Sequence, residues 1–280
     1  MKKLGFTNKN NVLFEKLKEE NPSWWKLLKN DSSLYIDIRK DNTINIYYNG
    51  SSVFKLNWSN KRYNALTHYK YVQNHDEIPN NPLKLKSNYV NKDVNKINEI
   101  IINEIKKEIQ KIPNLEKHIQ GDLIIAQDST YLDSEFAYNE EKNIRIDLVK
   151  LDTLNKKIVF VEIKRIKDSR LINKLEKGEV IQQLEKYRQF IIKYKKDIED
   201  YYKKIFILKK ELDILPKALQ KITNINDYNV SDSVELFIPL DDIENYKNEP
   251  KRIQDKERRK IRVEKIEQTL KDNNIKYKRQ

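Results

Sequence analysis

An aspartate and an acidic–apolar–basic tripeptide lie fifteen residues apart, in two segments with the pattern of β-strands. Asp147 belongs to the alternating segment 144–149, and Glu162-Ile163-Lys164 ends the apolar run that begins at Ile158. The connection between the segments is short and polar, which predicts antiparallel neighbours. Two carboxylates and an ammonium group on one sheet face suit a divalent cation and a phosphate diester. The pattern therefore predicts hydrolysis of phosphodiester bonds.

Strand alternation assigns a role to each of these residues. Glu162 and Lys164 share one face of their strand, and placing them on a covered face costs free energy unless something compensates. Asp147 beside Glu162 would raise the pKa of one carboxyl group. Mg²⁺ or Mn²⁺ removes this conflict, with both carboxylates and the carbonyl oxygen of Ile163 as ligands. Lys164 would then orient the attacking water or offset charge in the transition state.

The tripeptide alone has little specificity. The same three residues recur as Glu104-Ile105-Lys106, inside a segment predicted to be a long helix. The copy at 162–164 differs because an apolar strand and an aspartate-bearing strand come before it. The alternative interpretation is an ordinary cross-strand ion pair on a solvated sheet face.

Three short segments resemble the PD-(D/E)xK superfamily of restriction-like nucleases. They read RIDLV (145–149), VFVEIKR (159–165) and QLEKY (183–187), and the last resembles the QxxxY motif of the RecB-like branch. The resemblance implies that Asp147 and Glu162 bind metal and that Lys164 is the catalytic lysine. It also implies that Gln183 and Tyr187 steady the site or contact substrate from a helix. Ile146 stands where the family name has proline.

The resemblance spans about residues 91–202 and also implies an upstream glutamate. Glu135 is the candidate for this additional metal ligand, with Glu104 in reserve. A surface carboxylate on a hairpin is the alternative for Glu135. Helix packing is the alternative for Gln183 and Tyr187, because Leu184, Tyr187 and Ile191 also form an apolar stripe.

The expected fold is α/β, with a mixed central sheet flanked by helices 91–112 and 179–202, as in a restriction endonuclease-like core. Further strands are predicted at 123–126, 136–138, 205–208 and 234–240. This core would occupy residues 86–242. A small α+β domain would precede it over residues 1–85, ending in the polar segment 73–82, and a basic helical segment would follow over residues 243–280.

Composition favours a polyanionic partner. The formal net charge is +13 and the pI about 9.4, although a lysine-rich solvated surface is the alternative. Cysteine is absent, which excludes disulfides and a thiol nucleophile. No apolar run has the length of a bilayer span or a signal peptide, so a cytoplasmic protein without a membrane partner is expected.

Two further groups of residues have two interpretations each. The basic run Arg258, Arg259, Lys260 and Arg262 would line nucleic-acid phosphates, or else form a solvated charged helix. The three tryptophans would stack on bases, or else fill the core of the N-terminal domain, which is the interpretation we favour.

The sequence therefore predicts a Mg²⁺-dependent nuclease acting on nucleic acid, DNA rather than RNA. Restriction or antiviral defence is a setting suggested by analogy alone. A homodimer, and recognition of a target or partner protein by residues 1–85, are further expectations. The alternative functions are a non-catalytic nucleic-acid-binding protein that retains the nuclease fold and a structural interaction protein.

Overall fold

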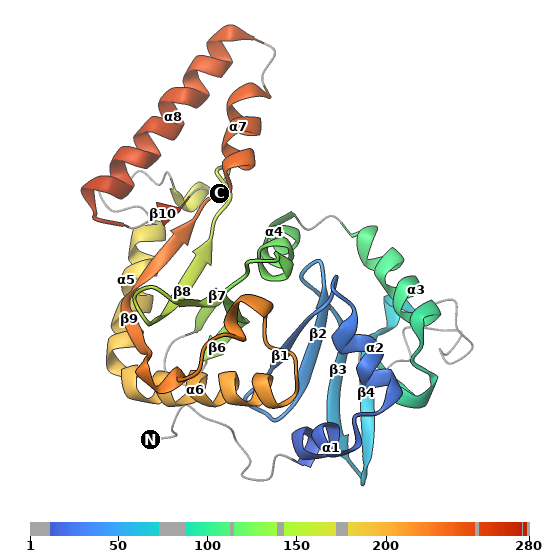
Figure 1. Cartoon of the computed structure of the whole chain (residues 1–280). Coiled ribbons are helices and arrows are strands. Elements are labelled where there is room, and N and C mark those ends of the chain that lie inside the picture. The colour runs from blue at the N-terminus through green and yellow to red at the C-terminus, as the bar shows by residue number, and fades with distance from the viewer. Residues whose placement is uncertain are drawn as a thin grey trace. The chain divides into compact units, whose positions relative to one another are not determined.

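The computed structural model describes residues 12–72, 88–112, 115–138, 143–171, 179–249, 252–275 and 277–278. Its helices are α1 (Val12–Glu20), α2 (Ser23–Asn30), α3 (Glu99–Gln110), α4 (Leu115–Ile125), α5 (Glu179–Lys193), α6 (Lys195–Glu211), α7 (Leu240–Asn248) and α8 (Ile253–Asp272) (Figure 1). Its strands are β1 (Tyr35–Ile38), β2 (Ile44–Tyr48), β3 (Ser51–Ser59), β4 (Arg62–His68), β5 (Tyr89–Lys92), β6 (Tyr131–Tyr138), β7 (Ile144–Asp152), β8 (Lys157–Ile163), β9 (Asn229–Phe237) and β10 (Tyr277–Lys278). The chain is therefore α/β, with two separate sheets.

The chain divides into two compact units that are not consecutive in sequence. Residues 1–130 and 200–225 form the first, and residues 131–199 and 226–280 form the second. The expected segments 1–85, 86–242 and 243–280 do not match this division. The first unit extends past residue 85 because β5 pairs with β4 and α3 contacts β3. The expected boundary segment 73–82 lies outside the described residues.

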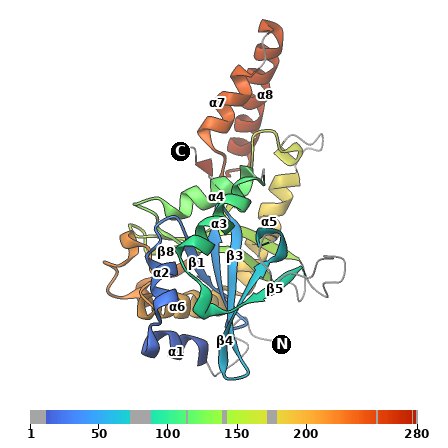
Figure 2. The same cartoon turned by 90° about the vertical axis from the view of Figure 1, so that its right-hand side faces the viewer.

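The first unit contains an antiparallel sheet in the order β1-β2-β3-β4-β5, seen with α1, α2 and α3 in Figure 2. The Asn49-Gly50 turn joins β2 to β3 with positive φ at both residues, 46° and 72°, as a type I′ hairpin requires. A Cβ atom on Gly50 would lie 2.3 Å from the carbonyl oxygen of Lys117, so this position needs glycine. Trp24 and Trp25 are buried in the core, as favoured.

The second unit contains a mixed sheet in the order β10-β9-β8-β7-β6. β8 pairs antiparallel with β7 and parallel with β9. The predicted antiparallel pairing of segments 144–149 and 158–163 is therefore confirmed. β8 lies between β7 and β9, and its residues from Ile158 to Ile163 are all buried. The helix α5 contacts the neighbouring strand β9.

Several predicted elements are wrong. The expected strand 123–126 belongs to α4, and the expected strand 205–208 belongs to α6. The expected helix 179–202 is two helices, α5 and α6, and the expected helix 91–112 is the shorter α3 of the first unit, preceded by β5. The strand expected at 234–240 begins earlier, as β9, and Leu240 starts α7. Four consecutive apolar residues at 205–208 fit a buried strand as well as a helix. In the structure, α6 buries Ile205 and Phe206 and exposes Ile207.

Candidate functional site

The ladder between β7 and β8 opens where the candidate residues lie. Its last registered pair is Leu148 with Val161, so the next position would set Asp147 opposite Glu162. There the backbone N–H of Ile163 donates instead to the Oδ2 of Asp147, at 2.7 Å. On the other side β8 stays paired with β9, and the N–H of Lys164 donates to the carbonyl of Phe237 at 2.9 Å. This geometry holds the Asp147 carboxylate beside the tripeptide.

The ammonium group of Lys164 contacts two of the predicted metal-ligand atoms. It forms an ion pair with the Oε1 of Glu162 and donates to the carbonyl oxygen of Ile163 at 3.0 Å. The side chains of Lys164 and Glu162 are 2% and 3% exposed. The amine and the carboxylate thus lie on one face of β8, as strand alternation predicts, and almost fully shielded from solvent.

The helical pair Gln183 and Tyr187 of α5 is hydrogen-bonded to this site. The amide nitrogen of Gln183 donates to the Oε1 of Glu162 at 2.8 Å and to the hydroxyl of Tyr187 at 2.6 Å. The Tyr187 hydroxyl in turn donates to the carbonyl of Arg145 on β7. One helical turn aligns the two side chains, and the structure brings all five predicted residues together.

Burial controls the charge of Glu162. Desolvation, together with the charge of Asp147, raises the pKa of this carboxyl group to about 7, and Lys164 and Arg170 oppose the rise. Burial, with the charge of Glu162, also raises the pKa of Tyr187 to about 12. A second oxygen of Glu162, Oε2, is buried and has no hydrogen-bond partner in the described part of the chain. Such an atom is costly unless a cation or donor satisfies it.

The residues present fit a divalent cation. Asp147, Glu162 and the Ile163 carbonyl supply hard oxygen donors, and a cation would satisfy the orphaned Oε2 of Glu162. Within the described ranges, no group of three or more His, Asp or Glu side chains is close enough to hold a metal ion. The site therefore offers two carboxylates and a carbonyl, and the remaining ligands would be water or phosphate oxygens.

Neither candidate upstream glutamate completes a group of three acidic side chains at this site in the described residues. Glu135 falls between the registered pairs Ser134–Leu148 and Phe136–Ile146 of β6 and β7, but its side chain is exposed and its φ is 52°. Glu104 belongs to α3 of the first unit. Neither forms a cluster with Asp147 and Glu162 in the described residues.

Sequence reasoning missed Arg170, which lies in a short 3₁₀ turn after β8. Its guanidinium binds Asp168 through two nitrogens, with Nε–Oδ1 2.9 Å and NH2–Oδ2 2.5 Å. Its charge opposes the rise in the pKa of both Glu162 and Tyr187. No periodic pattern or motif marks this position, so nothing in the sequence reveals it.

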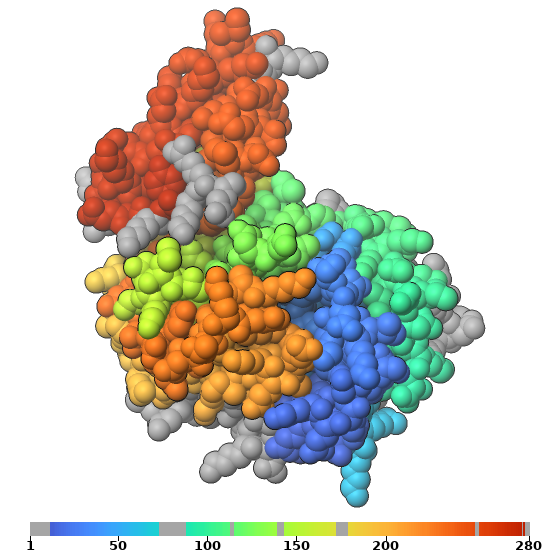
Figure 3. Space-filling model, viewed as in Figure 1, coloured from blue at the N-terminus to red at the C-terminus, as the bar shows by residue number. Residues whose placement is uncertain are grey.

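The predicted phosphate-binding run at the C-terminus has mixed roles. Arg259 donates to Glu249 at 2.6 Å and to the Tyr246 carbonyl at 3.0 Å, and its guanidinium lies 4.6 Å from the Tyr246 ring centroid. Arg262 lies 5.6 Å from the same centroid. Both residues thus contact Tyr246 of α7. The two helices α7 and α8 lie against each other (Figure 3). Arg258 and Lys260 are exposed, each 3.9 Å from an acidic side chain on the same helix.

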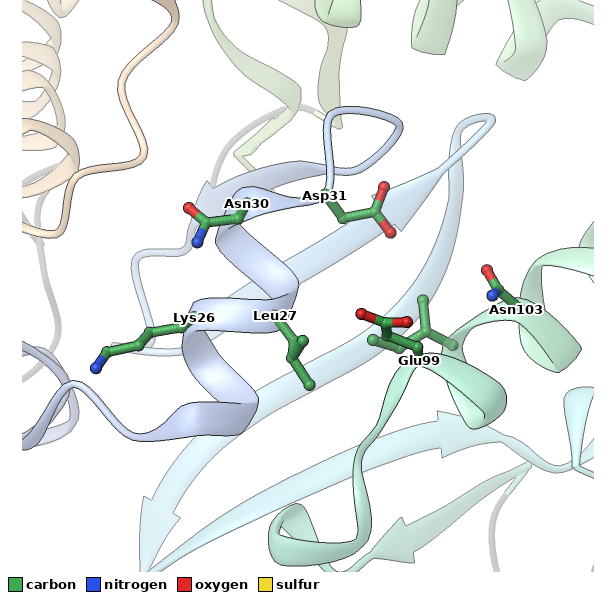
Figure 4. A pocket seen from close by; sticks show the side chains of 7 residues that line it. Lys26, Leu27, Asn30, Asp31, Glu99 and Asn103 are labelled. Atoms are coloured by element: carbon green, nitrogen blue, oxygen red, sulfur yellow. The ribbon is translucent and has the colours of Figure 1, made fainter.

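A shallow cleft of about 340 Å³ lies between α2 and α3 in the first unit. Its lining includes the apolar Ile102. Figure 4 shows Leu27, Lys26 and the carboxylates of Asp31 and Glu99 around it. Asp31 forms an ion pair with Lys106. Among the described residues, the lining of this cleft has no aromatic side chain.

Comparisons with known proteins add no relative. No family model, no curated protein and no solved structure matches this chain. Across the described residues, every helix is too short or too polar to cross a bilayer.

Proposed function

We propose that this protein is a divalent-metal-dependent nuclease of the PD-(D/E)xK type, which hydrolyses phosphodiester bonds in DNA. The observation that supports it is the meeting of Asp147, Glu162 and Lys164 at the open end of the β7–β8 ladder, with Gln183 hydrogen-bonded to Glu162. On this proposal the mixed sheet of the second unit is a restriction endonuclease-like core. The net charge of +13 is consistent with a polyanionic substrate.

Each residue has a distinct task in this proposal. The carboxylates of Asp147 and Glu162 and the carbonyl of Ile163 would hold Mg²⁺ or Mn²⁺, which when bound lowers the pKa of water and offsets phosphate charge. Lys164 would exchange its contact with Glu162 for one with the attacking water or a phosphate oxygen. Gln183 fixes the Glu162 carboxylate, and Tyr187 ties α5 to β7 through the Arg145 carbonyl.

A second candidate function has its own supporting observation. The Lys164–Glu162 ion pair is nearly closed to solvent, at 2% and 3% exposure. A buried ion pair of this kind can serve structure alone. The fold would then act as a non-catalytic nucleic-acid-binding platform.

Cleavage assays separate the two functions. Purified protein would be incubated with plasmid, linear DNA and RNA, with EDTA, Mg²⁺ or Mn²⁺. The nuclease proposal expects products that require the metal and are lost in Asp147→Asn. Metal-independent binding of DNA without any product, at protein concentrations above the Kd, would refute the nuclease and support the binding platform.

A further inference from the structure

A cleft of about 590 Å³ lies in the first unit, beside the β3–β4 hairpin. It is lined by Trp58, Lys61, Arg62 and Tyr63 of the hairpin and by residues 91–95 at the end of β5. Its volume falls in the range of about 300–1,000 Å³ typical of sites for small organic ligands. The lining combines aromatic rings with basic groups, which the cleft between α2 and α3 does not.

The hairpin holds the aromatic side chains in place. Trp58 and Tyr63 are cross-strand partners, and their ring centroids lie 4.8 Å apart at an interplanar angle of 81°. The Tyr63 hydroxyl donates to Glu20 at 2.8 Å, and its ring meets Trp24 edge-on at 5.2 Å. Tyr63 is thus fixed on two sides, and it supports the half-buried Trp58 at the cleft. Trp58 is therefore an ordered ring that remains partly accessible, which suits stacking on a base.

The tight turn places cations beside this ring. Asn60 and Lys61 have φ of 52° and 57°, so they form the two central positions of a type I′ turn. Lys61 and Arg62 are exposed, and in the described part of the chain neither forms an ion pair. Lys92 also lines the cleft, but it is only 4% exposed. The lining has one carboxylate, Asp93, which accepts the N–H of Asn95 at 3.0 Å.

We propose that this cleft binds a single-stranded segment of nucleic acid, with an unpaired base stacked on Trp58 and its phosphates on Lys61 and Arg62. Stacking on an aromatic face requires a base free of its duplex neighbours, and phosphate contacts supply the remaining affinity. This site belongs to a different unit from Asp147 and Glu162. Binding here goes beyond the proposed function and stands whether or not the second unit cleaves DNA.

Binding is tested with the full-length protein and a dye-labelled thymidine oligonucleotide, by fluorescence anisotropy in EDTA, so that no metal-dependent cleavage occurs. Trp58→Ala should weaken affinity about 5- to 150-fold, whereas Trp58→Phe, which keeps a ring, should retain most of it. Removing both charges with Lys61→Gln and Arg62→Gln should weaken affinity and reduce the slope of log K against log salt by about 0.7 for each phosphate that the variant no longer neutralises. An unlabelled duplex of equal length should compete poorly.

A matched control distinguishes binding at this cleft from binding caused by the net positive charge of the protein. Lys204 and Lys221 are exposed lysines of the same unit, and the double variant Lys204→Gln, Lys221→Gln should bind as the wild type does. The proposal would be overturned by an equal loss of affinity in both double variants, or by unchanged affinity in Trp58→Ala. Binding of the duplex as tightly as the single strand would also overturn it. If Trp58→Ala does not fold, the exposed pair Lys61 and Arg62 still decides the question.

A spectroscopic signal reports on Trp58 itself. The chain has three tryptophans, and Trp24 and Trp25 are buried at 4% and 1% exposure. Quenching by iodide should therefore fall mainly on Trp58, and the oligonucleotide should protect it. Quenching that the oligonucleotide does not change would contradict stacking on this ring.

Discussion

The buried carboxyl group of Glu162 should make stability depend on pH in a specific way. Its pKa rises from 4.5 to about 7 in the folded protein, first through desolvation and then through the charge of Asp147. The folded state therefore holds this proton more tightly than the unfolded chain does. The resulting stabilisation is fully present below about pH 4.5 and is lost as pH rises through 7. A pKa shift of this size changes the free energy of unfolding by about 3 kcal/mol.

The variant Glu162→Gln isolates this contribution, because glutamine stays neutral at every pH. Urea unfolding in EDTA would be measured for both proteins from pH 4.5 to pH 8. The wild type should lose about 3 kcal/mol relative to the variant across this interval. Adding Asp147→Asn to each protein should move the transition to lower pH, because the charge of Asp147 raises the pKa of Glu162. Parallel pH profiles for wild type and Glu162→Gln would refute the reasoning and indicate that Lys164 keeps the carboxylate ionised.

The same pair of proteins tests the metal site. A cation binds the carboxylate form, so stabilisation by Mg²⁺ should grow from pH 5 to pH 8 in the wild type. At a concentration of about 100 times Kd it should reach about 2.7 kcal/mol. The gain should be strongly reduced in Glu162→Gln. An equal gain in both proteins would show that Mg²⁺ binds elsewhere.

Other substitutions probe the remaining interactions. Asp147→Asn and Lys164→Met should each abolish DNA cleavage while the circular dichroism spectrum stays native, and cleavage by either variant would remove that residue from the proposed site. Tyr187→Phe deletes the hydroxyl that donates to β7, and it should reduce cleavage about 10- to 100-fold; an unchanged rate would assign Tyr187 to packing alone. Arg170→Leu should raise the pKa of Glu162 further, because Arg170 lowers it, so the pH transition in unfolding should move upward. Arg259→Ala should lower the melting temperature, because it removes the hydrogen bond and the ring stacking that join α8 to Tyr246 of α7, and an unchanged melting temperature would contradict that role.

The candidate site could be predicted from sequence because its parts depend on local periods. Alternation along a strand sets Glu162 and Lys164 on one face, and a spacing of four sets Gln183 and Tyr187 on one helical face. A short polar connection was enough to predict that β7 and β8 are neighbours. The hydrogen bond from Ile163 to Asp147 could not be predicted, because it depends on where the ladder opens.

The first unit was harder to predict because its contacts are long-range. Residues 200–225 belong to it although the whole second sheet except β9 and β10 comes before them in the chain. The turn between β3 and β4 is hard to predict because Asn60-Lys61 lacks the glycine that marks a type I′ turn, although both residues have positive φ. Arg170 was missed for a related reason, since a 3₁₀ turn has no sequence period to reveal it.

The two copies of Glu-Ile-Lys show why secondary structure decides what a tripeptide can do. In α3, residues two positions apart point in nearly opposite directions, and Lys106 pairs with Asp31 from the end of α2 instead of with Glu104. In β8, residues two positions apart lie on the same face of the strand, so Lys164 contacts Glu162. The strand copy also has Asp147 on the adjacent strand, whose carboxylate binds the backbone of the tripeptide itself. A motif of this length therefore predicts chemistry only together with the strand that contains it and the neighbour that completes it.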